Sequence, residues 1–212
     1  MARGETIYLY TRFERFWHWA QALLIVLLAV TGFEVHGSMH LMGFELAVAV
    51  HNYCGWAWLV LYAFIVFWLL TTGEWKQYSP TYRKLLEVLV YYVYGIFAGK
   101  PHPVPKTKRI KHNPLQRLTY LGVVSLLVPF QIATGFLYYT YSSWSALGWQ
   151  WSLQAMALLH TAGGFALIIF SIMHIYMITT GHTVLAHTKA MITGWEEVSE
   201  PQSVEAWEVK SR

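Results

Sequence analysis

The sequence predicts an all-α membrane protein: a four-transmembrane-helix bundle with an interfacial helix between the second and third spans. Of its 212 residues, 56% are hydrophobic and only 12% are charged, whereas soluble domains carry about 25% charged residues. No Asp, Glu, Lys or Arg occurs between Arg117 and Lys189. Four apolar stretches are long enough to cross the ~30 Å of hydrocarbon in a bilayer. We therefore predict one multi-pass membrane domain over residues 1–185 and a polar tail over 186–212.

The apolar stretches place the four spans at about residues 16–33, 49–72, 118–141 and 152–180. The long connection between the second and third spans contains a further apolar stretch over residues 85–99. That stretch is short for a span, and its tyrosines suit the headgroup zone, so we predict that it lies as a helix in the membrane interface. The N-terminal segment lacks a small-residue cleavage site, so we expect it to be retained as the first span.

The basic residues predict the orientation of the spans. The N-terminal segment and the connection over 73–117 carry twelve Lys and Arg residues, whereas the other two loops carry none. The positive-inside rule therefore places both termini and this connection in the cytoplasm. We expect the tail over 186–212 to be cytoplasmic and the polar segment from Gly181 onward to be partly disordered. The net charge of +4 does not indicate nucleic-acid binding, because the basic residues lie where they set topology.

Four histidines lie within the predicted spans: His18, His51, His160 and His174. His160 and His174 are 14 residues apart, which on a helix places both on one face with a rise of ~21 Å between them. Ionisable side chains at this depth are costly and usually functional. Matching the histidines by depth gives two pairs, His18 with His174 near the cytoplasm and His51 with His160 near the outer face.

Each pair of histidines is suited to hold one haem iron from opposite sides. The chain has a single cysteine, Cys54, and no C-x-x-C-H motif, so we predict two haems b, both bound non-covalently. Bis-histidine ligation leaves no coordination site open to a substrate and suits electron transfer. We assign the four histidines as axial ligands and assign no catalytic residue.

Small residues beside two of the histidines favour the same interpretation. Gly55 follows His51 by one helical turn, and Gly163 and Gly164 follow His160 by three and four residues. A flat cofactor wedged between helices needs small neighbours, and small residues also let helices approach closely. We therefore predict that these glycines line the cofactor sites.

Arg15 lies three residues before His18, on the same helix face and at the predicted cytoplasmic edge. Its guanidinium is permanently charged and binds carboxylates in a fork. We predict that Arg15 contacts a haem propionate.

Two other interpretations of the histidines stay open. They can be structural side chains, or they can form a metal-transport or proton pathway, although such a site usually includes carboxylates.

A weak internal repeat is also present, because Thr-Gly-Phe occurs at 31–33 and again at 134–136. The repeated motif is consistent with a duplicated pair of helices, and it is equally consistent with chance.

The chain resembles the di-haem cytochrome b subunits of respiratory formate dehydrogenases, nickel–iron hydrogenases and thiosulfate reductases, the prokaryotic cytochrome b561-like family. The resemblance covers about residues 10–185. It is carried by the element Arg15-Phe16-Trp17-His18-Trp19, by His51, by His160 with His174, and by the element Lys111-His112-Asn113-Pro114-Leu115-Gln116.

This resemblance implies a function in the cytoplasmic (inner) membrane of a bacterium or archaeon. Family members pass electrons between a periplasmic catalytic subunit, usually through an iron–sulfur or cytochrome c subunit, and a quinone or menaquinone. Carried over, Asn113 and Gln116 become candidate quinone-site residues, although an Asn-Pro pair is also a common helix start. The loop over 36–40 departs from the family pattern, which leaves the identity of the partner in doubt.

Two alternative functions follow from the same residues. One is a stand-alone transmembrane reductase of the ascorbate-linked b561 type, which needs no partner subunit. The other is a non-redox membrane anchor or transporter. A stand-alone reductase would have its haem reduced by a soluble donor such as ascorbate. A non-redox anchor or transporter would be colourless when purified.

Overall fold

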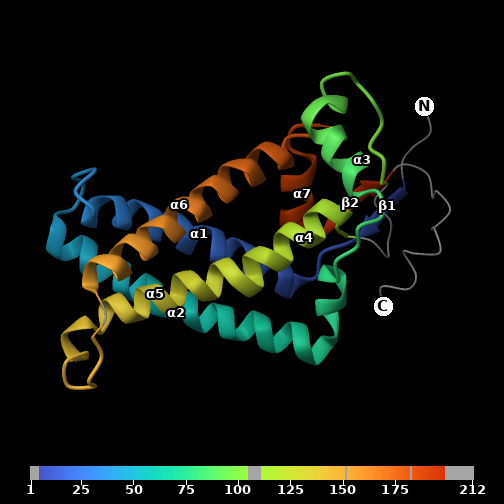
Figure 1. Cartoon of the computed structure of the whole chain (residues 1–212). Helices are drawn as coiled ribbons and strands as arrows, with labels where there is room; N and C mark the ends of the chain where they lie inside the picture. Colours follow the sequence, from blue (N-terminus) through green and yellow to red (C-terminus); the bar gives the residue numbers. More distant parts are fainter. Residues whose placement is uncertain (1–4, 105–110, 151, 182, 199–212) are drawn as a thin grey trace. The chain divides into compact units, whose positions relative to one another are not determined.

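A computed structural model describes residues 5–104, 111–150, 152–181 and 183–198 of the chain (Figure 1). These residues divide into two compact units, each assembled from separate stretches of sequence. The helical unit comprises Phe16–Phe67 and Ser125–Met173. The sheet-bearing unit comprises Met1–Arg15, Trp68–Val124 and His174–Arg212.

Four helices in the described part of the chain are long and apolar enough to cross a membrane, as the sequence predicts. They are α1 (Arg12–Val35), α2 (Phe44–Thr72), the helix that runs over Pro114–Tyr139, and α6 (Leu153–Ile178). At most 22% of the most apolar stretch of any of them is buried. Apolar side chains such as Leu23, Phe64 and Ile169 are instead exposed, as expected where lipid replaces water around a bundle.

Helix α1 begins four residues earlier than the predicted span because a capping box starts it. The Thr11 hydroxyl accepts from the Glu14 amide (3.3 Å), and the Glu14 carboxylate accepts from the Thr11 amide (2.7 Å). These bonds satisfy N–H groups that a helix start leaves unpaired.

The end of α1 and the loop after it are closed by hydrogen bonds. Gly37, at a φ of 79°, allows a Schellman motif in which the Ser38 amide donates to the Phe33 carbonyl. The Glu34 carboxylate is 3% exposed. One of its oxygens accepts from three backbone amides at 2.7–3.0 Å, those of Leu41, Met42 and Gly43.

The connection between the second and third spans contains the predicted extra helix. Helix α2 ends at Gly73, at a φ of 76°, and a 3₁₀ turn follows over Glu74–Tyr78. Helix α3 (Leu85–Val90) then continues into a π-helical turn over Tyr91–Gly95. Together they form an apolar helix over Leu85–Gly95, which is shorter than a span.

The third span consists of two α-helices joined by a π-helical turn. Helix α4 (Pro114–Gly122) leads through Val123–Leu127 into α5 (Val128–Tyr139). Proline cannot donate a backbone hydrogen bond and crowds the preceding turn. The π-helical turn ends two residues before Pro129 and accommodates it at the start of α5.

The C-terminal segment contains regular structure that its composition does not predict. Helix α7 (Ala186–Thr193) ends at Gly194, and strand β2 (Trp195–Val198) pairs antiparallel with β1 (Glu5–Tyr8). The two strands lie side by side in Figure 1. Residues 186–198 therefore form a helix and a strand, and residues 199–212 lie outside the described part.

The helical unit is held by side-chain contacts among α1, α2, α5 and α6. Phe33 of α1 packs on Phe165 of α6 at 5.9 Å between ring centroids, and Trp56 of α2 packs on Phe136 of α5 at 6.1 Å. His51 of α2 lies beside His160 of α6.

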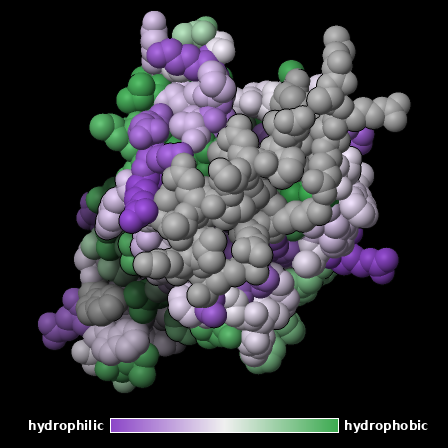
Figure 2. Space-filling model, turned by 90° about the vertical axis from the view of Figure 1, so that its right-hand side faces the viewer, coloured by the Kyte–Doolittle hydropathy of each residue, from purple (hydrophilic) through white to green (hydrophobic). Residues whose placement is uncertain are grey.

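The sheet-bearing unit is more polar than the helical unit. Lys111 is ion-paired with Glu14 at 2.8 Å and lies 3.8 Å from Glu74. Hydrophilic and hydrophobic side chains are mixed on the face shown in Figure 2. Apolar contacts also contribute here, since Ile7 and Leu9 of the N-terminal strand region are almost fully buried.

Candidate functional site

The structure distributes the four predicted ligands over the two units. His18 of α1, His51 of α2 and His160 of α6 belong to the helical unit, whereas His174, near the end of α6, belongs to the sheet-bearing unit. The predicted pair of His51 and His160 therefore lies within one unit, where its geometry is defined. The pairing of His18 with His174 stays a prediction.

The spacing of His51 and His160 fits two ligands of one metal ion. Their ring centroids are 6.1 Å apart, and the ring planes meet at 82°. An imidazole nitrogen binds a metal at about 2 Å, so two imidazoles on opposite sides of one ion have centroids about 6 Å apart. The part of the chain that the structure describes has no group of three or more His, Cys, Asp or Glu side chains arranged to hold a metal. Two axial nitrogens are all that a haem iron requires from the protein.

A threonine on the preceding helix holds the His51 ring. Thr31 is fully buried, and its hydroxyl lies 2.9 Å from His51 Nδ1. The same hydroxyl donates to the Leu27 carbonyl at 2.7 Å, so it accepts from the ring. This arrangement puts the proton on Nδ1 and leaves the Nε2 lone pair available for a metal ion.

His160 is held in a comparable way by α5. The Thr134 hydroxyl lies 3.2 Å from His160 Nδ1 and donates to the Phe130 carbonyl at 2.9 Å. The Gln131 side-chain amide lies 3.2 Å from Nδ1 and 3.4 Å from Nε2 of the same ring. His160 is thus contacted by two polar side chains, and both of them are buried.

The predicted glycines differ in their surroundings. A Cβ added at Gly55 would have no described atom within 4 Å, so the helix surface there is open. At Gly163 an added Cβ would meet Gln131 Oε1 and lie 3.1 Å from the Phe130 ring, and at Gly164 it would lie 3.8 Å from the Gln131 amide. Gly55 thus has room for a cofactor beside it, whereas Gly163 allows α5 and α6 to approach closely.

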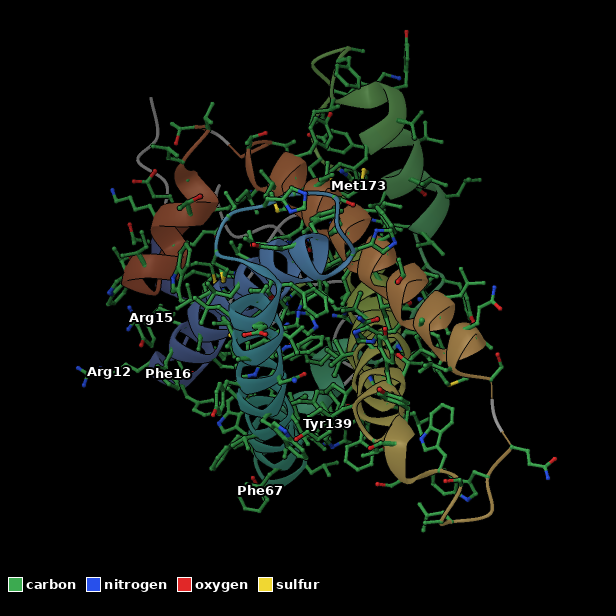
Figure 3. The ribbon with its side chains drawn as sticks, turned by 90° about the vertical axis from the view of Figure 1, so that its left-hand side faces the viewer. Arg12, Arg15, Phe16, Phe67, Tyr139 and Met173 are labelled. Carbon is green, nitrogen blue, oxygen red and sulfur yellow. The ribbon has the colours of Figure 1, made fainter. Side chains whose placement is uncertain are left out.

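Arg15 retains an unused donor in the described structure. Its Nη1 donates to the Ile192 carbonyl in α7, while its buried Nε has no hydrogen-bond partner among the described residues. Figure 3 shows Arg12 and Arg15 projecting from the start of α1. A guanidinium with a spare, buried Nε–H fits the predicted contact with a carboxylate such as a propionate.

Asn113 and Gln116 form the cap of the third span. The Asn113 side chain accepts from the Gln116 amide (2.9 Å), and the Gln116 side chain accepts from the Asn113 amide (3.0 Å). Pro114 follows at the first helical position. The helix-start interpretation of this element is therefore confirmed.

Asn113 also keeps a donor available beyond the cap. Its Nδ2 donates one hydrogen to the Tyr92 hydroxyl at 3.0 Å, and an amide nitrogen carries two. Burial raises the pKa of Tyr92 to about 12, so this hydroxyl stays neutral at ordinary pH. The cap and a ligand-binding role are therefore compatible.

A set of aromatic contacts links this loop to His174. The His112 ring stacks on Tyr78 at 5.4 Å between centroids and meets Tyr120 edge-on at 5.1 Å. Tyr120 in turn lies 6.4 Å from His174. Burial raises the pKa of Tyr78 well above its usual range, and the nearby Glu14 carboxylate adds to this effect. Tyr78 and Tyr120 belong to no sequence motif, so the sequence offers no signal for these contacts.

The fold and the His51/His160 site together define a membrane-spanning cytochrome of the b type. A model of the prokaryotic cytochrome b561 family matches residues 9–194, and the chain belongs to this family. The family implies a haem b cofactor and a role in membrane electron transport.

Similar proteins agree with this assignment. The chain is 34% identical to the cytochrome YdhU of Escherichia coli (strain K12) over 91% of its own length and 75% of that protein. It is 26% identical to a protein of Rhodobacter capsulatus named as a Ni/Fe-hydrogenase B-type cytochrome subunit, over 82% of the chain and 74% of that protein. A protein of the same name from Azotobacter chroococcum mcd 1 is 27% identical over 91% of the chain and 89% of its own length. No solved structure matches the chain significantly.

Proposed function

We propose that this chain is the membrane-anchoring, di-haem subunit of an oxidoreductase complex and passes electrons between a periplasmic partner and the quinone pool. His51 and His160 hold one haem b, and His18 and His174 hold a second. Bis-histidine haem supplies one-electron transfer without binding substrate. The protein contributes the ligands, their orientation and the quinone site.

The observation that carries this proposal is the geometry of the His51/His160 pair. The centroid separation of 6.1 Å suits two axial ligands. Nδ1 of each ring lies within hydrogen-bond distance of a buried threonine hydroxyl, which favours a lone pair on Nε2 of both rings; at His160 the Gln131 amide also lies 3.4 Å from Nε2. Metal-bound histidines usually have their second ring nitrogen held in this way.

The proposed quinone site is the region around Asn113 and Gln116, next to the second haem. Asn113 has a second Nδ2 hydrogen for a quinone carbonyl, and His112 and Tyr120 connect this loop to His174. Quinone reduction consumes protons, and the half-buried ion pair of Lys111 and Glu14 supports a unit that accommodates charge.

The orientation and partner complete the proposal. The Lys and Arg residues of the N-terminal segment and the 73–117 connection favour both termini in the cytoplasm of a bacterium or archaeon. The catalytic partner then docks on the periplasmic side, directly or through an iron–sulfur or cytochrome c subunit. Relatives named as Ni/Fe-hydrogenase subunits support a hydrogenase as one candidate.

A reduced-minus-oxidised optical spectrum of the purified chain, with haem quantified per polypeptide, tests this function. We expect two haems b per chain and reoxidation of the reduced protein by a quinone analogue. A single haem would contradict the pairing of His18 with His174. Rapid reduction by ascorbate without a partner would favour the stand-alone reductase, and a colourless protein would contradict any electron-transfer role.

A further inference from the structure

The two Thr-Gly-Phe motifs have equivalent positions in the helical unit. Thr31 lies in α1 and contacts His51 at the start of α2, and Thr134 lies in α5 and contacts His160 near the start of α6. Both threonines are buried, at 0% and 5% exposure. The repeat that is weak in the sequence therefore has the same contact in both copies.

The direction of these hydrogen bonds follows from the single proton of a hydroxyl. Thr31 donates that proton to the Leu27 carbonyl four residues earlier, and Thr134 donates to the Phe130 carbonyl four residues earlier. Each hydroxyl oxygen is then an acceptor toward its histidine. A hydrogen bond from either imidazole to its threonine therefore needs the proton on Nδ1, which leaves the lone pair on Nε2; at His160 the Gln131 amide also lies 3.4 Å from Nε2.

The glycine of each motif provides space for the same ring. A Cβ added at Gly32 would lie 3.5 Å from His51 Cε1, and a Cβ added at Gly135 would lie 2.9 Å from His160 Cε1. Carbon atoms at 2.9 Å are too close, so any side chain at Gly135 would displace the His160 ring. Threonine and glycine therefore constrain one imidazole together, the first by a hydrogen bond and the second by close packing.

We propose that Thr31 and Thr134 are matched positioning residues, each fixing the tautomer and orientation of one axial histidine of the same haem. This inference rests on the proposed function, since it requires that His51 and His160 ligate one iron. The hydrogen bond also increases the electron donation of the imidazole to the metal, because a partly withdrawn Nδ1 proton makes the ring more basic.

The residue three before the threonine differs in polarity between the two copies, and this difference ranks their expected effects. It is Leu28 in the first copy and Gln131 in the second. The Gln131 side chain lies 3.2 Å from His160 Nδ1 and keeps a polar contact with that ring, whereas the side chain of Leu28 is apolar. We therefore expect loss of Thr31 to have a larger effect than loss of Thr134.

Replacement of each threonine in the purified, haem-loaded protein tests the proposal. For Thr31→Val we expect haem affinity at one of the two sites to fall about 10- to 100-fold, and for Thr134→Val a smaller fall at the same site. The midpoint potential of that haem should become more positive, because a less basic ligand stabilises ferric iron less, and its low-spin electron paramagnetic resonance signal should shift. Thr31→Ser and Thr134→Ser retain the hydroxyl and should restore the wild-type values.

Two controls separate this inference from the proposed function. Thr140→Val removes a hydroxyl at the C-cap of α5 that donates to the Phe136 carbonyl and contacts no histidine among the described residues, so both haems should be unchanged. The second haem reports the folding of every variant. If His51→Ala removes one haem but both valine variants leave affinity, potential and resonance signal unchanged, the positioning inference is wrong and the proposed function stands. If the two valine variants alter different haems, the shared site is also wrong.

Discussion

The regions around His160 and around His174 lie on the same helix, α6, yet they use different contacts. His160 is surrounded by α2 and α5, and its partners are a histidine, a buried threonine and a buried glutamine. His174 lies in the sheet-bearing unit, where its neighbour Tyr120 contacts His112, and where Lys111 and Glu14 form a half-buried ion pair. The first environment holds its histidine by hydrogen bonds with buried side chains, whereas the second surrounds its histidine with aromatic and charged groups.

The largest expected effect is loss of a haem on removal of a ligand from the first region. His160→Ala leaves His51 without an opposite ligand, so we expect haem content to fall from two to one per chain. Quinol oxidation by the remaining haem should persist, because the quinone region lies in the other unit. Haem quantification and stopped-flow reduction by a quinol analogue measure both properties, and loss of both haems would contradict the independence of the regions.

His174→Ala is the matching change in the second region. We again expect one haem per chain, but reduction by a quinol analogue should be lost because the haem next to the quinone site is absent. The chain should remain reducible by dithionite through the His51/His160 haem. Quinol reduction at the wild-type rate would show that the quinone site is not near His174.

An intermediate effect is expected at Asn113, where capping and ligand binding are separable. Asn113→Asp keeps an oxygen for the helix cap but removes the Nδ2 donor, so we expect about tenfold weaker binding of a quinone analogue, equivalent to one hydrogen bond. Asn113→Ala should show the same loss and also about 1 kcal/mol lower stability from the missing cap. Titration of the analogue by fluorescence or calorimetry checks both variants. Wild-type affinity in Asn113→Asp would exclude this residue from the site.

The smallest effect concerns alkaline stability of the second region. The pKa of Tyr92 is raised in the folded protein to about 12. The contribution of Tyr92 to the free energy of unfolding is therefore complete below about pH 10 and is lost as the pH rises through 12. A shift of this size corresponds to about 2–3 kcal/mol. We expect Tyr92→Phe to reduce the fall in unfolding free energy between pH 10 and 12, measured by denaturant titration in detergent. Tyr82→Phe, at an exposed position, is the matched control and should leave the fall unchanged.

The sequence predicted the spans because each is a long apolar stretch with polar ends. It placed the start of the third span four residues late, since the cap formed by Asn113 and Gln116 lies in polar sequence outside the apolar run. The Asn-Pro pair was the signal for that start, and it was recognised as one of two possibilities.

The contacts that orient the histidines were less accessible to sequence reasoning. Thr31 and His51 lie on different helices, and the hydrogen bond between them depends on how α1 packs against α2. The repeated Thr-Gly-Phe motif was the available signal, but three residues recur easily by chance. The pairing of β1 with β2 was likewise not predictable, because it joins segments from opposite ends of the chain.

The loop between α1 and α2 shows how a fixed backbone can carry variable side chains. Three amides of this loop are satisfied by the Glu34 carboxylate, so the backbone conformation depends little on the identity of the exposed residues His36, Ser38 and His40. Substitutions at these positions therefore leave the loop folded and change only the surface that it offers. Selection can alter this surface freely to suit a new binding partner, while Glu34 itself has little tolerance for replacement.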